Sequence, residues 1–361
     1  MGMSLRRNFF WTFAVFVVVI ACLLVYVRFG RVPKNVAYVS EEEGGVVVIN
    51  LNTLKVVKRI QPKDTAPRGI GITFDGKDVV TANKDTADAS VFDTRGGLHF
   101  VRRIPVGDNP EFVKLNPSGT SAFISYEPGS TAGPPQEGAS GDEDDDDANE
   151  PPAQIMQFNV SDWSRVQSFV AGKETEGLEF TPDGKSLIVA NEAADSLGVY
   201  DVAAGKLTRT IDLASYGKRP RGVKVSPQGN SYAVTMEGSG TLLWLDQNLN
   251  VIRSVATAAK PYGVAFDRQG SRIFVNAAAA RKMQVYAADS LQLLGETPIG
   301  QRCWHFTFTP DDSKLLLACG RSNNIYVIDA KTYQPIRVLD GFHLPWGIVT
   351  YPRAFGSLGL P

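Results

Sequence analysis

A block of about ten residues that recurs seven times is the strongest constraint that this sequence places on its fold. Successive complete blocks end 43, 65, 45, 41 and 42 residues apart, and the one long step contains an acid-rich stretch. A repeat of this length indicates one supersecondary unit copied along the chain. The copies are PRGIGITFDG (67–76), PEFVKLNPSG (110–119), TEGLEFTPDG (175–184), PRGVKVSPQG (220–229), PYGVAFDRQG (261–270), CWHFTFTPDD (303–312) and the final PWGIVTYP (345–352).

Each repeat contains four short β-rich runs. The turn residues that end the block favour a tight reversal into a second run, such as VVTAN (79–83) or LIVAN (187–191). A third run closes on Asp or Asn, as in VVVIN (46–50) and IYVID (325–329), and a fourth follows, as in VVKRI (56–60). The Asx side chain can bond backbone groups ahead of it and so fix the turn between the last two runs. Four strands at this period are typical of propeller blades.

The two ends of the repeat region complete one another. VAYVS (36–40) matches the second run of a repeat, and GIVT (347–350) matches the first. Pairing these ends closes a ring and removes the open edges that a linear array would expose. We therefore predict an all-β fold, a seven-bladed β-propeller with four-stranded blades, against the alternatives of a β-sandwich or a stack of separate hairpins.

The N-terminal region contains 19 consecutive residues without a charge, Phe9 to Val27. As a helix this segment would be roughly 28 Å long, enough to cross the hydrocarbon layer. We predict one transmembrane helix that acts as an uncleaved signal anchor; a cleaved signal peptide and lipidation at Cys22 are the alternatives, and the flanking basic residues leave the orientation open. The expected organisation is a short charged N-terminus (1–8), the anchor (9–27), a linker (28–35), the propeller (36–352) and a C-terminal tail (353–361).

The stretch 127–154 contains nine acidic residues and no Lys or Arg. Removing these nine negative charges from the formal net charge of −1 leaves about +8 on the rest of the chain. The stretch falls between the second and third runs of one repeat, and its Pro, Gly, Ser and acid content cannot bury a core, so we expect a disordered insertion. It could dock a basic partner such as a cytochrome, weakly hold calcium, or be only a solvated loop.

The repeat, seen as LIVAN followed by GVYDVAAGKLTRTI (187–211), resembles the YVTN-repeat β-propellers, which are WD40-like in architecture. Residues 300–349 are similar to the C-terminal part of the propeller associated with pyrroloquinoline-quinone-dependent alcohol catabolism, which shares a GQR-x-W segment, a G-x-SN segment and a terminal PWG. The resemblance implies a periplasmic or secreted propeller with a binding or accessory role and without established catalytic residues. A periplasmic dehydrogenase is then an expected partner.

The second residue of each block is expected at one mouth of the central channel. These residues combine two cations, two carboxylates and three aromatic rings, which could clamp an anionic or planar ligand. The alternative is structural, with Arg–Glu pairs between blades and tryptophans plugging the channel. The predicted ligand-binding residues are Arg68, Glu111, Glu176, Arg221, Tyr262, Trp304 and Trp346.

Two of the three histidines, His305 and His343, are expected near the same mouth. With Glu111 or Glu176 they could bind a divalent metal, but no ligand spacing supports this and we predict no metal site and no cofactor. Cys303 and Cys319 lie 16 residues apart across one predicted hairpin, which would place them opposite each other. They could form a disulfide or remain two buried thiols.

No phosphate loop, nucleophile elbow or acid–base pair stands out in the sequence. We therefore expect a membrane-anchored extracytoplasmic propeller that binds a ligand or a protein without catalysis, in quinoprotein-dependent alcohol catabolism. One alternative is a lactonase-like, metal-dependent hydrolase that uses the central channel. The other is single-stranded nucleic-acid binding, which the scattered distribution of the basic residues disfavours.

Overall fold

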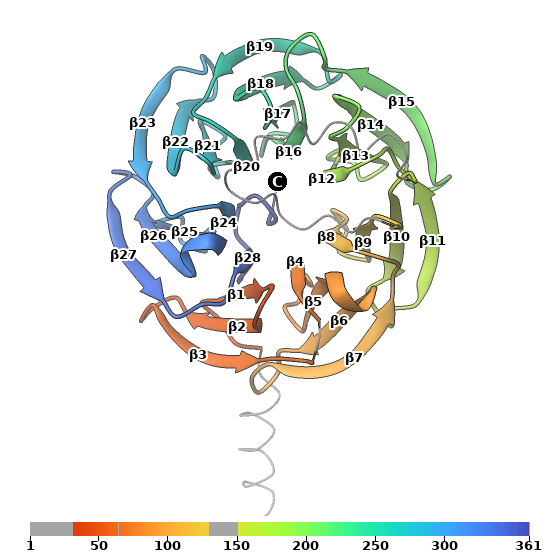
Figure 1. Cartoon of the computed structure of the whole chain (residues 1–361), viewed down its shortest axis with the longest axis vertical. Coiled ribbons are helices and arrows are strands. Elements are labelled where there is room, and N and C mark those ends of the chain that lie inside the picture. Colours follow the sequence, from red (N-terminus) through yellow and green to blue (C-terminus); the bar gives the residue numbers. More distant parts are fainter. Residues whose placement is uncertain (1–31, 64, 130–150, 361) are drawn as a thin grey trace, which may run out of the picture.

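The computed structural model describes residues 32–63, 65–129 and 151–360, and these form a ring of seven four-stranded antiparallel sheets around a central axis (Figure 1). The seven-bladed propeller predicted from the repeat is confirmed. Each repeat block forms the innermost strand of its blade, followed outward by the second, third and fourth runs. The ring closes as expected, because β1 pairs with both β28 and β2 in a sheet ordered β28-β1-β2-β3.

The strands that line the axis and those next to them share nearly complete burial. The innermost strands are β4 (Pro67–Ile72), β8 (Pro110–Leu115), β12 (Thr175–Phe180), β16 (Pro220–Val225), β20 (Pro261–Phe266), β24 (Cys303–Phe308) and β28 (Pro345–Tyr351). The second strands are β5 (Asp78–Asn83), β9 (Ser121–Tyr126), β13 (Ser186–Asn191), β17 (Ser231–Met236), β21 (Arg272–Ala277), β25 (Lys314–Cys319) and β1 (Val36–Glu41).

The third strands are still buried between blades, whereas most residues of the fourth strands face solvent. The third strands are β6 (Asp88–Asp93), β10 (Gln154–Asn159), β14 (Ser196–Asp201), β18 (Thr241–Asp246), β22 (Lys282–Ala287), β26 (Asn324–Asp329) and β2 (Gly45–Asn50). The fourth strands are β7 (His99–Pro105), β11 (Arg165–Val170), β15 (Lys206–Asp212), β19 (Val251–Ala256), β23 (Leu293–Pro298), β27 (Pro335–Asp340) and β3 (Lys55–Ile60). Two short 3-10 helices, η1 (Lys84–Thr86) and η4 (Gly320–Ser322), follow second strands.

The Asx residues at the ends of third strands act as predicted. The Asn50 Oδ1 accepts hydrogen bonds from the backbone N–H groups of Asn52 and Thr53, both at 3.0 Å. The Asp329 carboxylate accepts the corresponding bonds from Lys331 and Thr332 at 2.9 and 2.7 Å. These bonds fix the turn into the fourth strand locally, so that each blade is specified within its own repeat.

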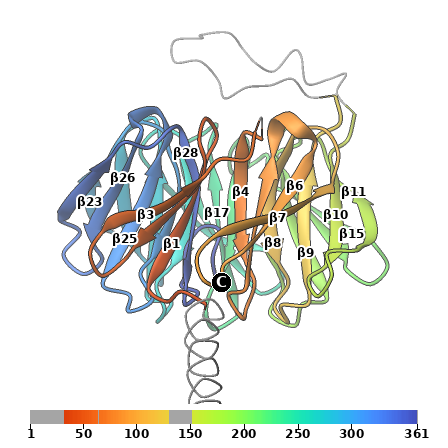
Figure 2. The ribbon, with the colours of Figure 1, turned by 90° about the horizontal axis from the view of Figure 1, so that it is seen from below.

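The two ends of the channel differ in what they carry. We call the end where the innermost strands begin the upper mouth and the end where they turn back the lower mouth; the upper mouth lies at the top of Figure 2. The connection between β9 and β10 leaves from the upper mouth, as predicted for the acidic insertion, but Gln154 already belongs to β10. Residues 130–150 lie outside the described residues, so the expected disorder and docking role remain predictions.

The chain enters the propeller at the lower mouth, because Val36, the first residue of β1, pairs with Tyr351, the last residue of β28. The apolar segment 9–27 lies outside the described residues. Among the residues that the structure does describe, no helix is long and apolar enough to cross a bilayer. The anchor therefore remains a prediction.

The C-terminal tail does not extend away from the propeller but turns back into its channel, near the centre of the ring in Figure 1. Gly356 forms an antiparallel bridge with Thr307 of β24, and the Phe308 N–H donates to the Phe355 carbonyl at 2.8 Å. Ser357 reaches the level of His305, near the start of β24, where its hydroxyl lies 3.0 Å from His305 Nδ1. The tail thus fills the axis from the lower mouth upward.

The Cys303–Cys319 disulfide is present and joins β24 to β25 at the register predicted from the 16-residue offset. The same offset pairs Pro67 with Asn83 and Thr175 with Asn191. Replacing both cysteines by Ala should lower the free energy of unfolding by about 3 kcal/mol, because the bond closes a loop of this length in the unfolded chain.

Urea unfolding followed by tryptophan fluorescence would measure this loss, with Cys22→Ser as the control for removing a cysteine elsewhere in the chain. Mass spectrometry after alkylation adds a direct readout. Unreduced protein should take up label on Cys22 alone, and labelling of all three cysteines in folded protein would show that the bond is not formed.

Candidate functional site

The second residues of the seven innermost strands gather at the upper mouth, as the repeat predicted. Six of the seven are buried, and Arg221 is partly exposed, with 14% of its side chain accessible. The position is set by the register, because every innermost strand starts at the same end of the ring. The structure divides these residues into two charged groups and an aromatic group.

Arg221 is the centre of the larger charged group. Its guanidinium forms ion pairs with Glu176, with Glu192 at 2.8 Å and with Glu237 at 2.5 Å. It also donates to the Tyr262 hydroxyl at 3.2 Å and lies 4.6 Å from the centre of the Tyr262 ring. We call these five residues the Arg221 cluster. Glu192 also pairs with Arg219 at 2.5 Å and Glu237 with Arg302 at 3.7 Å, so Glu176 is the carboxylate of the cluster that has Arg221 as its sole ion-pair partner among the described residues.

Arg68 forms the smaller charged group. Its guanidinium pairs with Glu111 from the next blade and with Glu42 at 3.3 Å. Lys84 contributes a further cation 3.6 Å from the same Glu42 carboxylate. Arg68 and Arg221 both pair with protein carboxylates. These contacts agree with the structural alternative, in which Arg–Glu pairs join neighbouring blades.

Glu192 and Glu237 are members of the Arg221 cluster that were not predicted from the sequence. Each follows the second strand of its blade, 16 residues after a residue of the predicted ring, Glu176 or Arg221. This is the offset that brings Cys303 opposite Cys319, so the signal was present in the repeat. Applying the offset to the second position of each block would have placed both carboxylates at the upper mouth.

The third position of each block decides what fills the channel. Five blocks have glycine there, and a Cβ on Gly177 would lie 2.4 Å from the Arg221 carbonyl of the neighbouring strand. Glycine is thus required where two innermost strands approach closely. The other two blocks have Phe112 and His305, whose rings meet edge to face at 5.6 Å although their blades are not adjacent.

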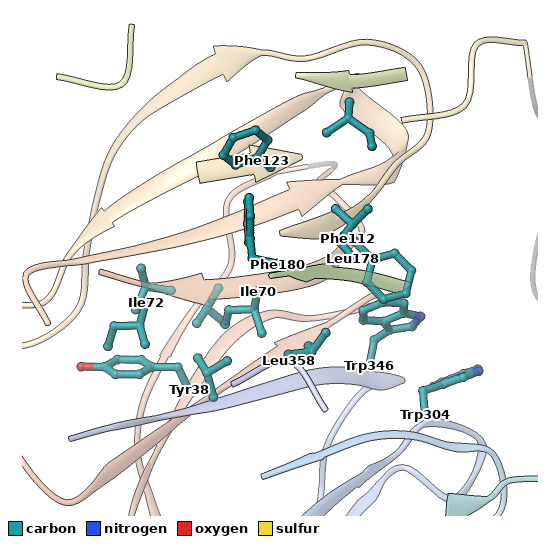
Figure 3. Packing of buried hydrophobic residues seen from close by; sticks show 14 of the residues in the cluster. Tyr38, Ile70, Ile72, Phe112, Phe123, Leu178, Phe180, Trp304, Trp346 and Leu358 are labelled. Atoms are coloured by element: carbon teal, nitrogen blue, oxygen red, sulfur yellow. The ribbon is translucent and has the colours of Figure 1, made fainter. Parts of the chain in front are cut away.

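Trp346 completes the aromatic group, with its ring 5.3 Å from that of Phe112 and 4.4 Å from that of His305. Figure 3 shows Phe112 against Trp346, with Leu358 of the tail in the same cluster. Trp304 packs instead on Gly320, where even a Cβ would overlap its ring. The aromatic side chains therefore close the channel.

Between these groups lies a cavity of about 20 Å³ that Arg221, Tyr262, His305, Phe112 and Ser357 help to line. It has room for about one water molecule. One oxygen of Glu176, Oε2, and the Nε2 atom of His305 have no hydrogen-bond partner among the described residues. A buried carboxylate with one unpaired oxygen, beside an arginine, is a suitable place for proton transfer.

Burial sets the protonation states of this site. Burial raises the pKa of Glu176 well above the usual value of a carboxyl group, and Arg221 offsets this only in part. The pKa of Glu192 is raised for the same reason. Burial, together with the nearby Arg221, lowers the pKa of His305 to about 3, so this imidazole is neutral at pH 7. Among the described residues no carboxylate lines the cavity itself, and Glu176 reaches it through Arg221, which lines the cavity and pairs with Glu176.

The residues do not fit a divalent metal. His305 is buried and its Nδ1 faces Ser357, whereas His343 is exposed, with its backbone N–H bonded to Glu41. The carboxylates considered as further ligands, Glu111 and Glu176, are each held by an arginine. Within the described ranges no three His, Cys, Asp or Glu side chains are grouped to hold a metal.

Residues 159–251 match the protein family described as lactonase, 7-bladed beta-propeller. No relative was found among curated proteins. Solved structures share the fold at 14–18% identity. They include a protein of unknown function from Desulfotomaculum acetoxidans (14% identity, TM-score 0.73, covering 88% of this chain and 98% of that one). A candidate 6-phosphogluconolactonase from Bacteroides fragilis has 18% identity and a TM-score of 0.69, with 87% and 96% covered. The periplasmic gluconolactonase of Pseudomonas aeruginosa has 16% identity and a TM-score of 0.70, with 90% and 99% covered.

The family match corrects the function expected from the sequence. A non-catalytic binding module in alcohol catabolism was the wrong choice, and the match of residues 159–251 favours the lactonase-like alternative. The error arose because the carboxylates and the arginine that could act on a substrate lie on different blades and form no local motif. The finer resemblance of residues 300–349 to the quinone-associated propeller remains a prediction.

Proposed function

We propose that this protein hydrolyses lactones at the Arg221 cluster. The observation that carries the proposal is the position of the family match: residues 159–251 contain Glu176, Glu192, Arg221 and Glu237, four of the five members of the cluster. The part of the chain that resembles lactonases therefore supplies nearly all of its buried charged site.

In the proposed reaction Glu176 acts as the general base. Its carboxylate takes a proton from a water molecule, and the resulting hydroxide adds to the lactone carbonyl carbon. Once Glu176 has taken the proton it is neutral, so the Arg221 N–H group that paired with it becomes available to the negative charge that develops on the carbonyl oxygen. When the ring C–O bond breaks, the leaving ring oxygen takes the proton back from Glu176, and the product is a hydroxy acid. The bonds and protons of this reaction balance without a cofactor.

The charges around the site favour a neutral lactone. Arg221 and Arg68 are already paired with carboxylates, so a phosphate group on the substrate would meet no unpaired arginine there. Because the cavity holds only about one water molecule, a lactone must displace surrounding side chains when it enters. We therefore expect an uncharged sugar lactone to be preferred over its phosphorylated form.

The test is acid release by the purified full-length chain from glucono-δ-lactone and from 6-phosphoglucono-δ-lactone, measured by pH-stat with the spontaneous rate subtracted. We expect a rate proportional to protein concentration, and a higher kcat/KM for the unphosphorylated lactone. Absence of protein-dependent acid release from both compounds would contradict the proposal. A clear preference for the phosphorylated lactone would contradict the argument from the paired arginines.

The predicted anchor completes this proposal. The chain enters the propeller at the lower mouth, where β1 begins. An anchor at residues 9–27 would therefore hold the lower mouth toward the membrane. The Arg221 cluster lies at the opposite end of the channel. The site would then face away from the membrane, toward soluble substrates in the compartment that holds the propeller.

A further inference from the structure

A second cavity lies at the lower mouth, at the opposite end of the channel from the Arg221 cluster. Its volume is about 250 Å³, large enough for several water molecules or a small organic molecule. The ends of β8, β12 and β16 and the turns after them form its walls, and the C-terminal tail contributes Arg353 and Leu360. We call it the lower-mouth pocket.

Two buried lysines and one buried carboxylate form the polar side of this pocket. Glu179 lines the pocket between Lys114 at 2.8 Å and Lys224 at 2.9 Å, and all three side chains are at least nine-tenths buried. The Lys224 Nζ also donates to the carbonyl oxygens of Gly359 at 3.2 Å and Leu360 at 2.9 Å, which ties the tail to the pocket. One carboxylate thus holds two amino groups, and burial lowers the pKa of the Lys224 amino group to about 7, although Glu179 raises it.

Arg353 adds a further cation, and no acid pairs with it among the described residues. Its guanidinium carbon lies 3.7 Å from the centre of the Phe74 ring, and it makes no ion pair with any residue that the structure describes. Burial lowers the pKa of Arg353 to about 10, although Glu179 raises it, so the group remains charged at pH 7. A half-buried, charged guanidinium at the wall of a cavity is costly unless an anion is near.

The remaining walls are mostly apolar. Leu115, Val225 and the prolines of three repeat turns, Pro117, Pro182 and Pro227, surround the polar end of the pocket. An occupant that satisfies both parts needs an anionic group at one end and an apolar body at the other. A carboxylate matches the planar fork of an arginine and leaves the rest of the molecule free to contact the apolar wall.

We propose that the lower-mouth pocket binds a small organic carboxylate with an apolar body, its carboxylate held by Arg353 and Lys114. This site is separate from the proposed catalytic site and requires no reaction. Because each carboxylate–guanidinium hydrogen bond contributes more than a neutral one, loss of Arg353 should weaken binding about tenfold or more.

Isothermal titration calorimetry on the full-length protein tests this, with benzoate as the probe and benzamide as its neutral counterpart of the same shape. We expect saturable binding of benzoate, no binding of benzamide, and weaker binding of gluconate, whose body is polar. Equal binding of benzoate and benzamide, or no saturable binding of benzoate, would overturn the proposal.

Arg353→Met should lose about tenfold or more in benzoate affinity. Arg268→Met is the matched control, since Arg268 also lies over a phenylalanine ring, that of Phe355, but does not line the pocket; it should bind as the wild type does. Unchanged affinity in Arg353→Met would also overturn the proposal. If Arg353→Met does not fold, the test rests on two other measurements. These are the benzoate affinity of Arg353→Lys, which keeps the charge, and the comparison of benzoate with benzamide on the wild type. Lactone hydrolysis should be unaffected by Arg353→Met, so the two proposals can fail separately.

Discussion

Replacing Glu176 by Gln should lower kcat/KM for lactone hydrolysis by roughly two to four orders of magnitude, the usual contribution of a positioned general base. Gln keeps the shape of the side chain but cannot take a proton from water. Arg221 retains Glu192 and Glu237 as partners, so the fold should persist. Initial rates on glucono-δ-lactone, together with circular dichroism of the variant, would measure both effects.

The pH profile separates a catalytic role of Glu176 from a structural one. Burial raises the pKa of Glu176, so its base form is lost as the pH falls through a value above the usual carboxyl range. The wild-type kcat/KM should therefore fall on the acidic side with an apparent pKa above 4.5, and the residual activity of Glu176→Gln should lack this limb.

Glu41→Gln is the matched control for Glu176→Gln. Glu41 is also a buried carboxylate whose pKa burial raises and which an arginine holds, but its partner is Arg59, outside the Arg221 cluster. Its substitution should change kcat/KM by less than about tenfold. Equal losses in the two variants would mean that any buried carboxylate at this end of the ring affects activity through the fold.

Replacing Arg221 by Met should destabilise the protein by about 3–5 kcal/mol at pH 7, the usual result of removing one partner from a buried ion pair. Glu192 retains Arg219 as a partner and Glu237 retains Arg302, whereas Glu176 loses the only ion pair found for it among the described residues. The change leaves buried negative charge without compensation. Urea unfolding at constant m-value would measure the loss.

The same variant should show a characteristic dependence on pH. Without Arg221 the buried carboxylates bind protons more tightly in the folded than in the unfolded protein, so folding becomes less favourable as the pH rises through the carboxyl range. The difference between the wild type and Arg221→Met should thus be small near pH 4 and complete at pH 7. A difference that does not change with pH would indicate lost packing instead of stranded charge.

Two further variants complete the test of Arg221. Arg209→Met is the control, because Arg209 is an exposed arginine that donates to the Asn248 carbonyl at 2.8 Å, and its loss should matter by less than about 0.5 kcal/mol. Combining Arg221→Met with Glu176→Gln should recover part of the stability, since the stranded charge is removed. Failure of the double variant to recover any stability would contradict the electrostatic explanation.

The repeat predicted the ring, its closure and the pairing of Cys303 with Cys319, because each of these depends on short-range turn chemistry and on a constant offset within one blade. It also placed the seven mouth residues correctly, since the second position of every innermost strand lies at the same end of the ring. Local information is sufficient for a fold whose units are local.

Only the tertiary structure decided what those residues do. Glu192, Arg221 and Tyr262 come from three different blades, and no spacing in the sequence reports that they share one buried site. The return of the tail into the channel, where Ser357 meets His305, depends on contacts across about 50 residues. The same is true of Arg353 at the lower mouth. Within a blade the repeat sets the geometry, whereas the chemistry at both mouths depends on where seven separate units converge on one axis.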